Sequence, residues 1–235
     1  MIEDFVDTDT LASLVREIDQ FEEKVERQMR NLSGGKAFIG RADEITFSSH
    51  LVRHSKLLRN YVSRPAFLDL CLDILGPDVR LYWDHAVYKK PGVEKPFPWH
   101  QDNGYTFLSP QQYLTTWTAL TDADENNGCL YSVPGMHKLG TLEHTLTDLG
   151  NICFEKPPVT PVPIPVKAGS LVIMSAITPH QTGANFTQQV RKGYVVQYAH
   201  EGAKAHTVDA HGNPVEKPAC QEDRQFAILK NGQAV

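Results

Sequence analysis

The chain has 235 residues, 41% of them apolar and 22% charged, which suits one soluble globular domain with a core of useful size. Its formal net charge is −5 and its basic residues form no stripe, so neither nucleic acid nor an anionic membrane is expected as a partner. No run of about 18 apolar residues occurs, so we expect no membrane-spanning helix.

The two ends of the sequence and its cysteines favour a cytoplasmic protein. The opening "MIEDFVDTDTLASL" is acidic and lacks the basic and apolar regions of a signal peptide, and "NGQAV" at the end is not a peroxisomal signal. The cysteines are widely spaced and form no CxxC pair, which is typical of reduced thiols: Cys71, Cys129, Cys153 and Cys220. We therefore expect a cytoplasmic location.

The first third of the chain is predicted to be mainly helical. Residues 8–31 show apolar residues at helical spacing, with Thr8 or Asp9 as the expected cap, and "SGGK" then ends the helix. Residues 53–75 are predicted to form a second helix, or two helices separated at Pro65.

From residue 79 the sequence changes to short segments rich in Val, Tyr and Trp, which predict strands. Turn sequences such as "DADENNG" and "GANFTQQ" separate these segments, and the Pro-rich "KPPVTPVPIPV" is expected at a sheet edge or in a connector. Helices followed by many short strands predict an α+β protein with a β-sandwich or barrel core. We divide the chain into a mainly helical part at 1–78, a β-rich core at 79–200 and a C-terminal extension at 201–235.

The stretch "PWHQDNGY" places His100 and Asp102 two positions apart. On a strand, such residues point to the same face and lie about 7 Å apart at their Cα atoms, near enough to bind one ion. His180, after the apolar "SLVIMSA", is the candidate third ligand, with His137 and His200 as rivals. Two histidines and one carboxylate on one face of an iron leave three positions open for O₂ chemistry. The alternative is a polar loop in which the pair is only hydrogen-bonded.

Arg191 and Thr182 are predicted to bind a co-substrate. Arg191 follows His180 by eleven residues at the start of "VRKGYVVQY", and we expect a hairpin to bring it back beside the histidine. A guanidinium binds a carboxylate through two hydrogen bonds, and the nearby hydroxyl of Thr182 adds another. This pair suits the far carboxylate of a 2-oxo diacid whose other end chelates the metal.

Three segments together resemble the phytanoyl-CoA dioxygenase family over about residues 80–200: "KKPGVEKPFPWHQDNGY", "WTALTDADENNGCLYSVPGMHK" and "AGSLVIMSAITPHQTGANFTQQVRKGY". The resemblance implies a single oxygenase domain over 1–235 with a double-stranded β-helix (jelly-roll, cupin-like) core and N-terminal helices packed on it. It implies Fe(II), 2-oxoglutarate and O₂ as cofactor and co-substrates. The implied site residues are His100, Asp102 and His180 for iron, and Arg191, Thr182, Trp117 and either Ala86 or Tyr88 for 2-oxoglutarate.

The function that follows is a dioxygenase that hydroxylates an unactivated C–H bond of a small molecule and releases succinate and CO₂. Desaturation, epoxidation and rearrangement stay open, as does the substrate: a CoA thioester, a free acid, an amino acid or a secondary metabolite. A non-catalytic barrel that binds a small ligand or a metal is the alternative, although such a barrel would not need Arg191 with Thr182. A halogenase is disfavoured because Asp102 occupies the position that chloride would need, and a nucleic-acid demethylase is disfavoured by the absence of a basic surface.

Residues beside the candidate site have less specific expectations. Gln101, Asn103 and Tyr105 flank the His-Asp pair and are candidates for the lip of the site. His85 either lines the pocket or packs on its strand. Trp83 and Trp99 are expected in the core.

Overall fold

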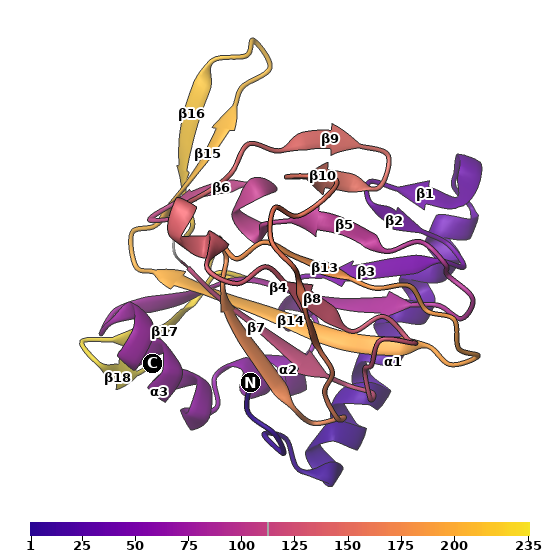
Figure 1. Ribbon diagram of the computed structural model, residues 1–235. Coiled ribbons are helices and arrows are strands. Elements are labelled where there is room, and N and C mark those ends of the chain that lie inside the picture. Colours follow the sequence, from indigo (N-terminus) through magenta and orange to yellow (C-terminus); the bar gives the residue numbers. More distant parts are fainter. Residues whose placement is uncertain (112) are drawn as a thin grey trace.

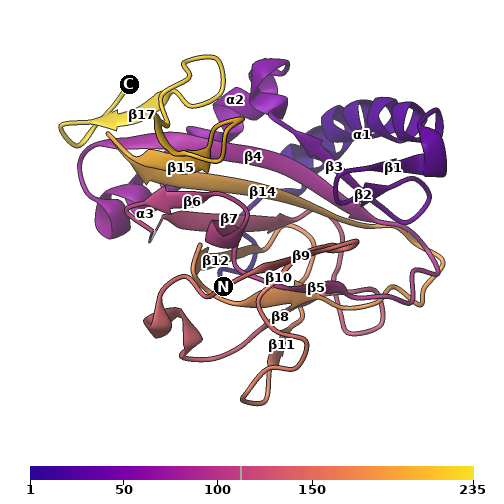
Figure 2. The ribbon, with the colours of Figure 1, turned by 90° about the horizontal axis from the view of Figure 1, so that it is seen from above.

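The computed structural model describes residues 1–111 and 113–235, and in it two antiparallel sheets face each other (Figures 1 and 2). Within these residues the larger sheet has the strand order β1-β2-β3-β4-β14-β7-β12, with β17 pairing with β4 and β18 with β17. The smaller sheet has the order β11-β8-β13-β5. Two small sheets, β16-β15-β6 and β10-β9, complete the set, and the β15–β16 hairpin projects from the body at the top of Figure 1.

The strands of the larger sheet are β1 (Lys36–Ala37), β2 (Gly40–Arg41), β3 (Ile45–Ser49), β4 (Val79–Lys89), β7 (Leu114–Ala119), β12 (Leu171–Ser175), β14 (Arg191–His200), β17 (Ala227–Lys230) and β18 (Gln233–Ala234). Those of the smaller sheet are β5 (Phe97–His100), β8 (Leu130–Ser132), β11 (Val162–Ile164) and β13 (His180–Thr182). The remaining strands are β6 (Phe107–Ser109), β9 (Thr145–Thr147), β10 (Gly150–Ile152), β15 (Lys204–Val208) and β16 (Pro214–Pro218).

The helices lie where the sequence predicts them. Helix α1 (Thr8–Arg30) begins one residue after Asp7, whose side chain accepts a hydrogen bond of 2.8 Å from the backbone N–H of Thr10, so Asp7 is the cap in place of the expected Thr8 or Asp9. The second helical stretch is two helices, α2 (Lys56–Val62) and α3 (Pro65–Leu75). Pro65 begins α3, because the first turn of a helix has no use for the missing N–H. None of the helices in the described ranges combines the length and apolar character needed to cross a membrane.

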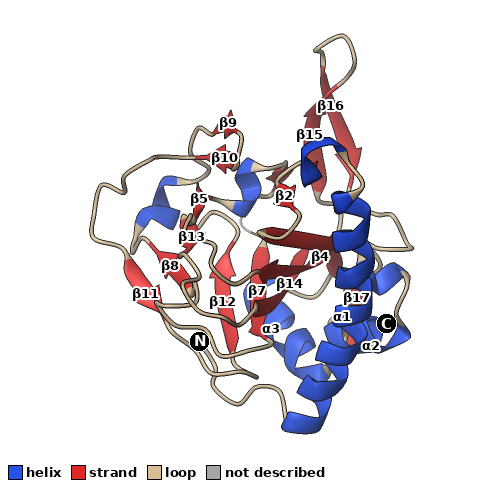
Figure 3. Cartoon of the chain, turned by 90° about the vertical axis from the view of Figure 1, so that its right-hand side faces the viewer, coloured by secondary structure: helices blue, strands red, loops and turns tan. Residues whose placement is uncertain are grey.

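The helices cover the outer face of the larger sheet (Figure 3), and the apolar residues of both form one core. Leu14 and Ile18 of α1 and Phe67 of α3 are fully buried there, against Tyr194 and Tyr198 of β14. The inner face of the larger sheet meets the smaller sheet in a second cluster, which includes Val87, Trp117 and Val195. The Pro-rich segment supplies β11 at the edge of the smaller sheet, as expected.

Asp84 is a fully buried carboxyl group beneath the helices. Its Oδ2 accepts hydrogen bonds from the hydroxyl of Tyr194 at 2.9 Å and from the backbone N–H of Val52 at 3.3 Å. Burial raises the pKa of Asp84 to about 6, whereas the usual value is 3.8. The folded chain therefore keeps this proton at pH values where the unfolded chain has lost it.

This difference makes a prediction about stability. The contribution of Asp84 is full below about pH 4 and is lost as the pH rises through about 6, a change of roughly 3 kcal/mol. In Asp84→Asn no proton is exchanged, so the free energy of unfolding of the variant should rise relative to that of the native chain between these pH values. Urea unfolding at closely spaced pH values measures the difference. A constant difference across the range would show that Asp84 titrates normally.

Candidate metal centre

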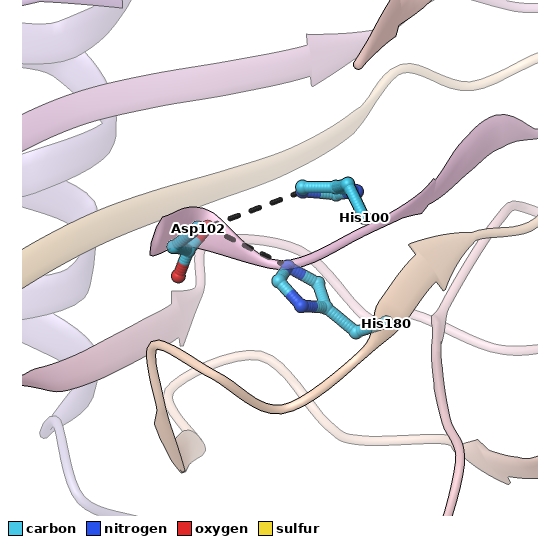
Figure 4. A group of neighbouring side chains, drawn as sticks. All are labelled: His100, Asp102 and His180. Atoms are coloured by element: carbon cyan, nitrogen blue, oxygen red, sulfur yellow. Dashed lines mark ion pairs between the residues drawn. The ribbon is translucent and has the colours of Figure 1, made fainter. Parts of the chain in front are cut away.

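The three residues expected to bind metal meet at one place between the sheets (Figure 4). His100 is the last residue of β5, Asp102 begins the short 3₁₀ turn Asp102–Gly104, and His180 is the first residue of β13. Strands β5 and β13 are neighbours, and His180 is the direct register partner of His100. One potential ligand atom from each of the three side chains lies within 4.8 Å of the other two.

The hydrogen bonds of the two imidazoles determine which nitrogen faces the carboxylate. Nδ1 of His100 lies 2.8 Å from the carbonyl oxygen of Pro98, and Nδ1 of His180 lies 2.9 Å from that of Thr178. A carbonyl oxygen only accepts, so each Nδ1 carries a proton and donates it, which leaves Nε2 as the nitrogen whose lone pair a metal can use. These Nε2 atoms lie 4.0 Å (His100) and 3.8 Å (His180) from Oδ1 of Asp102.

The two Nε2 atoms and the carboxylate oxygen therefore converge, and a cation bound between them would satisfy all three. Burial, together with the neighbouring His180, lowers the pKa of His100 to about 3, which keeps its ring neutral and able to bind metal. Two imidazole nitrogens and one carboxylate oxygen are the donor set of non-haem Fe(II) sites. The residues present thus fit the metal that the sequence predicts.

The second carboxylate oxygen of Asp102 is held by a residue that sequence reasoning did not single out. The hydroxyl of Thr115, on the inner face of β7, donates to Oδ2 at 2.6 Å. The side-chain amide of Gln197 on β14 in turn donates to the Thr115 hydroxyl at 3.4 Å. This chain of hydrogen bonds orients the carboxylate from the larger sheet, while both histidines come from the smaller one.

Of the three residues that were candidates for the lip of the site, only one lies there. Gln101 and Asn103 are buried: the Gln101 amide donates to the carbonyls of Gly140 at 2.9 Å and Ile177 at 2.6 Å, and the Asn103 side chain bonds to Thr141 at 2.7 Å and to the backbone N–H of Leu108 at 2.8 Å. Only Tyr105 lines the cavity beside the metal centre, with its ring edge-on to His100. The expectation is therefore wrong for Gln101 and Asn103, which hold the metal loop in place.

Arg191 is fully buried and has no hydrogen-bond partner for its guanidinium among the described residues. Its carbon Cζ lies 5.8 Å from the centre of the Trp117 ring, and burial lowers the pKa of Arg191 to about 10, so the side chain stays charged. Trp117 Nε1 and Thr182 Oγ1 are also buried without partners. A Cβ atom at Gly193 would lie 2.5 Å from the Trp117 ring, so glycine is needed for the indole to lie there.

An unpaired buried guanidinium is costly, and an anion is the partner that would offset the cost. No hairpin brings Arg191 back beside His180, however. Thr182 lies on β13 in the smaller sheet and Arg191 on β14 in the larger sheet, so the turn between them crosses from one sheet to the other. The expected hairpin is wrong, because each strand finds its hydrogen-bond partners in a different sheet.

Lys89 is a second buried cation, which the sequence does not reveal because "YKKPG" resembles an exposed turn. It is the register partner of Arg191. Its Nζ donates to the carbonyl oxygens of Lys95 at 3.2 Å, Thr182 at 3.5 Å and Gly183, and burial, together with the Arg191 charge, lowers the pKa of Lys89 to about 7. Lys89 thus ties the strand that carries Thr182 to the strand beside Arg191.

The expected co-substrate contact on β4 was assigned to the wrong face of the strand. Ala86 and Tyr88 lie in the cluster beneath the helices, and the Tyr88 hydroxyl donates to Asp19 of α1 at 2.7 Å. Alternation along a strand then turns His85, Val87 and Lys89 to the inner face. Ala86 and Tyr88 are therefore excluded as side-chain contacts of a co-substrate bound between the sheets.

Three other histidines lie outside the His-Asp-His cluster: His85, His137 and His200. His85 lines the cavity beside the metal centre, and burial lowers its pKa to about 4. The rival ligands His137, on an exposed turn, and His200, at the end of β14, are not part of the three-residue cluster.

Comparison with known proteins agrees with this picture. A family model described as phytanoyl-CoA dioxygenase (PhyH) matches residues 1–193. A curated "Phytanoyl-CoA dioxygenase" of Arabidopsis thaliana is 33% identical over 113 residues, which cover 46% of this chain and 40% of that relative. The chain thus spans about two fifths of the length of this relative.

Solved structures show the same fold. The epimerase SnoN, crystallised with Fe³⁺, alpha ketoglutarate and nogalamycin RO, has a TM-score of 0.72 at 20% identity and covers 96% of this chain and 92% of its own. EvdO2 from Micromonospora carbonacea var. aurantiaca, complexed with 2-oxoglutarate, has a TM-score of 0.56 at 25% identity and covers 80% of this chain and 74% of its own. The expected double-stranded β-helix core with helices packed on it is confirmed.

Proposed function

Because the chain belongs to the phytanoyl-CoA dioxygenase family, we propose that it is an Fe(II)- and 2-oxoglutarate-dependent dioxygenase that hydroxylates an unactivated C–H bond of a small molecule. One observation carries the proposal: the interior between the sheets holds both a convergent His-Asp-His cluster and a buried guanidinium without a partner among the described residues. A barrel that only bound a metal would have no use for the second feature.

His100, Asp102 and His180 are the proposed iron ligands, and their fixed tautomers leave the Nε2 lone pairs free for the metal. Iron with 2-oxoglutarate and O₂ supplies the oxidant, one oxygen atom entering succinate as CO₂ leaves and the other entering the product hydroxyl. Arg191 and Thr182 are proposed to hold the far carboxylate of 2-oxoglutarate, with Trp117 packed beside it. The other work of the protein is to place one C–H bond near the metal and exclude water.

The experiment that tests this function is an assay of purified protein with Fe(II), 2-oxoglutarate and O₂. We expect succinate to form, and to form faster when a substrate from a metabolite library is present. The control is the same protein with Asp102→Ala, which keeps the fold but loses the anionic ligand. Absence of succinate under every condition, with iron and 2-oxoglutarate both bound, would favour the non-catalytic barrel.

Thr115→Val is expected to weaken metal binding by about 10- to 100-fold, because the variant no longer orients Oδ2 of Asp102. The measurement is competition for Fe(II) or Mn(II) with a chromophoric chelator, which needs no turnover. The neighbouring Thr116→Val is the matched control: its buried hydroxyl donates to the carbonyl of Val196 at 3.0 Å, so its loss affects stability and not the metal. Equal metal affinities in the two variants would contradict the role of Thr115.

Two further proposals come from the sequence alone. We propose a cytoplasmic location from the wide spacing of the four cysteines, which is typical of reduced thiols. The division into parts at residues 78 and 200 also stays a prediction.

A further inference from the structure

A cavity of about 570 Å³ opens beside the metal centre and reaches His100 and Asp102. Its walls come from the C-terminal half of α1, the β1–β2 segment, β3, β4 and the residues after the metal loop. We propose that this cavity binds an uncharged, ring-bearing small molecule, and that His85 orients it through a hydrogen bond. The proposal rests on the function proposed above, because it takes the cavity as the substrate site.

The charges around the metal centre are divided between two compartments. Among the described residues that line the cavity none is Lys or Arg, and its acidic member is the proposed ligand Asp102. The buried cations Arg191 and Lys89 do not line it and lie where 2-oxoglutarate is proposed to bind. Apart from the proposed metal, whose charge Asp102 and bound 2-oxoglutarate would offset, the cavity offers an anion no counter-ion for its lost hydration, so a carboxylate or a CoA thioester is disfavoured there.

The walls of the cavity are rich in rings. Aromatic side chains bind flat apolar molecules through stacked or edge-to-face contacts. The aromatic residues that line the cavity, histidines apart, are Phe38, Phe47, Tyr82, Trp83, Phe97, Tyr105 and Tyr113. Val25 and Met29 of α1 and Leu32 just after it add aliphatic side chains to the wall. This lining matches a ring-bearing molecule better than a polar metabolite such as an amino acid.

His85 is a polar residue in this lining that has a buried atom without a partner among the described residues. It lies on the inner face of β4, with its ring 5.9 Å from that of Phe47. Its Nδ1 is buried and has no hydrogen-bond partner in the described part of the chain. A hydroxyl or carbonyl group on a bound molecule would satisfy this nitrogen and fix the orientation of the molecule relative to the metal.

The test is direct binding, measured by fluorescence anisotropy of an anthracene ring, with metal-free protein and with protein loaded with Ni(II) and saturated with 2-oxoglutarate. The probes are 9-anthracenemethanol, 9-anthracenecarboxylate and 9-methylanthracene, which differ in charge and in hydrogen bonding but share one ring system. We expect the alcohol to bind at least about tenfold more tightly than the carboxylate. Benzoyl-CoA should not displace the alcohol.

Two variants test the two parts of the proposal. Gln28→Lys adds a cation at an exposed helical position that lines the cavity, and it should strengthen binding of the carboxylate relative to that of the alcohol. His85→Phe should weaken binding of the alcohol by about three- to tenfold and leave 9-methylanthracene unaffected. Because Nδ1 of His85 has no partner in the described residues, its removal leaves no protein group newly unpaired.

Equal affinity for the alcohol and the carboxylate, displacement by benzoyl-CoA, or no binding of the alcohol up to its solubility limit would each overturn the proposal. The succinate assay is an independent readout. Selective binding of the alcohol by a protein that never forms succinate would overturn the proposed function and support the cavity assignment. Succinate formation by a protein that prefers the anionic probes would support the proposed function and overturn the cavity assignment.

Discussion

Arg191→Met is expected to weaken binding of 2-oxoglutarate by about thirty- to thousandfold while leaving metal binding intact. Methionine fills a similar volume but offers neither charge nor donors. The guanidinium has no partner among the described residues, so its loss removes the contact to the far carboxylate and breaks no other bond that we observe. Arg191→Lys should recover only part of the affinity, because an ammonium group is a point charge without the fork of donors.

The measurement is an anaerobic titration of each iron-loaded protein with 2-oxoglutarate, following the metal-to-ligand absorption of the chelate. Arg80→Met is the matched control. Arg80 is also a buried arginine, but its guanidinium donates to the carbonyl of Gln225 at 3.0 Å and pairs with Glu201 at 3.1 Å. Its replacement should lower stability without changing the affinity for 2-oxoglutarate.

The two substitutions should therefore change the melting temperature in different ways: Arg80→Met should lower it, and Arg191→Met should not. Arg191→Met removes a buried uncompensated charge, so the melting temperature of the ligand-free protein should stay the same or rise. Addition of 2-oxoglutarate should raise the melting temperature of the native chain and not that of the variant. If the native chain and Arg191→Met bind 2-oxoglutarate equally well, Arg191 is a structural residue and the co-substrate is held elsewhere.

The second large effect is expected at the metal ligands. Asp102→Ala and His180→Ala should each abolish hydroxylation and lower metal affinity by about two orders of magnitude or more. This loss is larger than the one expected for Thr115→Val, which removes only a hydrogen bond to a ligand. Asp102→Ala removes the anionic ligand, and His180→Ala removes the nitrogen that faces it at 3.8 Å. Metal content after loading and dialysis measures both.

His137→Ala and His200→Ala are the controls, because both residues were rivals for the third ligand and neither belongs to the cluster. Both variants should retain metal and activity. Loss of metal in His137→Ala together with its retention in His180→Ala would show that the ligand set is wrong.

The sequence predicts those features of the fold and the site that depend on residues near one another in the chain. The sequence predicts α1 because apolar residues recur at helical spacing along most of its length, and the structure moves only the cap, by one or two residues. His100 and Asp102 were predicted as a pair because side chains two apart on a strand share a face. His180 and Arg191 follow this pair in the order that the phytanoyl-CoA dioxygenase family has, and this order supports the resemblance.

Other features depended on packing that the sequence does not display. Strand β4 is buried on both faces, so its residues show no alternation of polar and apolar types, and the inner face was assigned to Ala86 or Tyr88 in error. Lys89 was overlooked because a lysine beside a turn is usually exposed. Thr115 gave no signal, because threonine is common in strands for reasons of packing alone.

The sequence by itself therefore determined the elements, the candidate ligands and the chemistry that their types allow, because those follow from short-range periodicity and residue type. Only the tertiary structure decided which faces meet. The crossing from β13 to β14 places Thr182 and Arg191 in opposing sheets. The helix α1 and the segment after it close a neutral cavity over the metal loop, away from the buried cations. Contacts between residues far apart in the chain arise from sheet pairing and burial, and no local pattern specifies them.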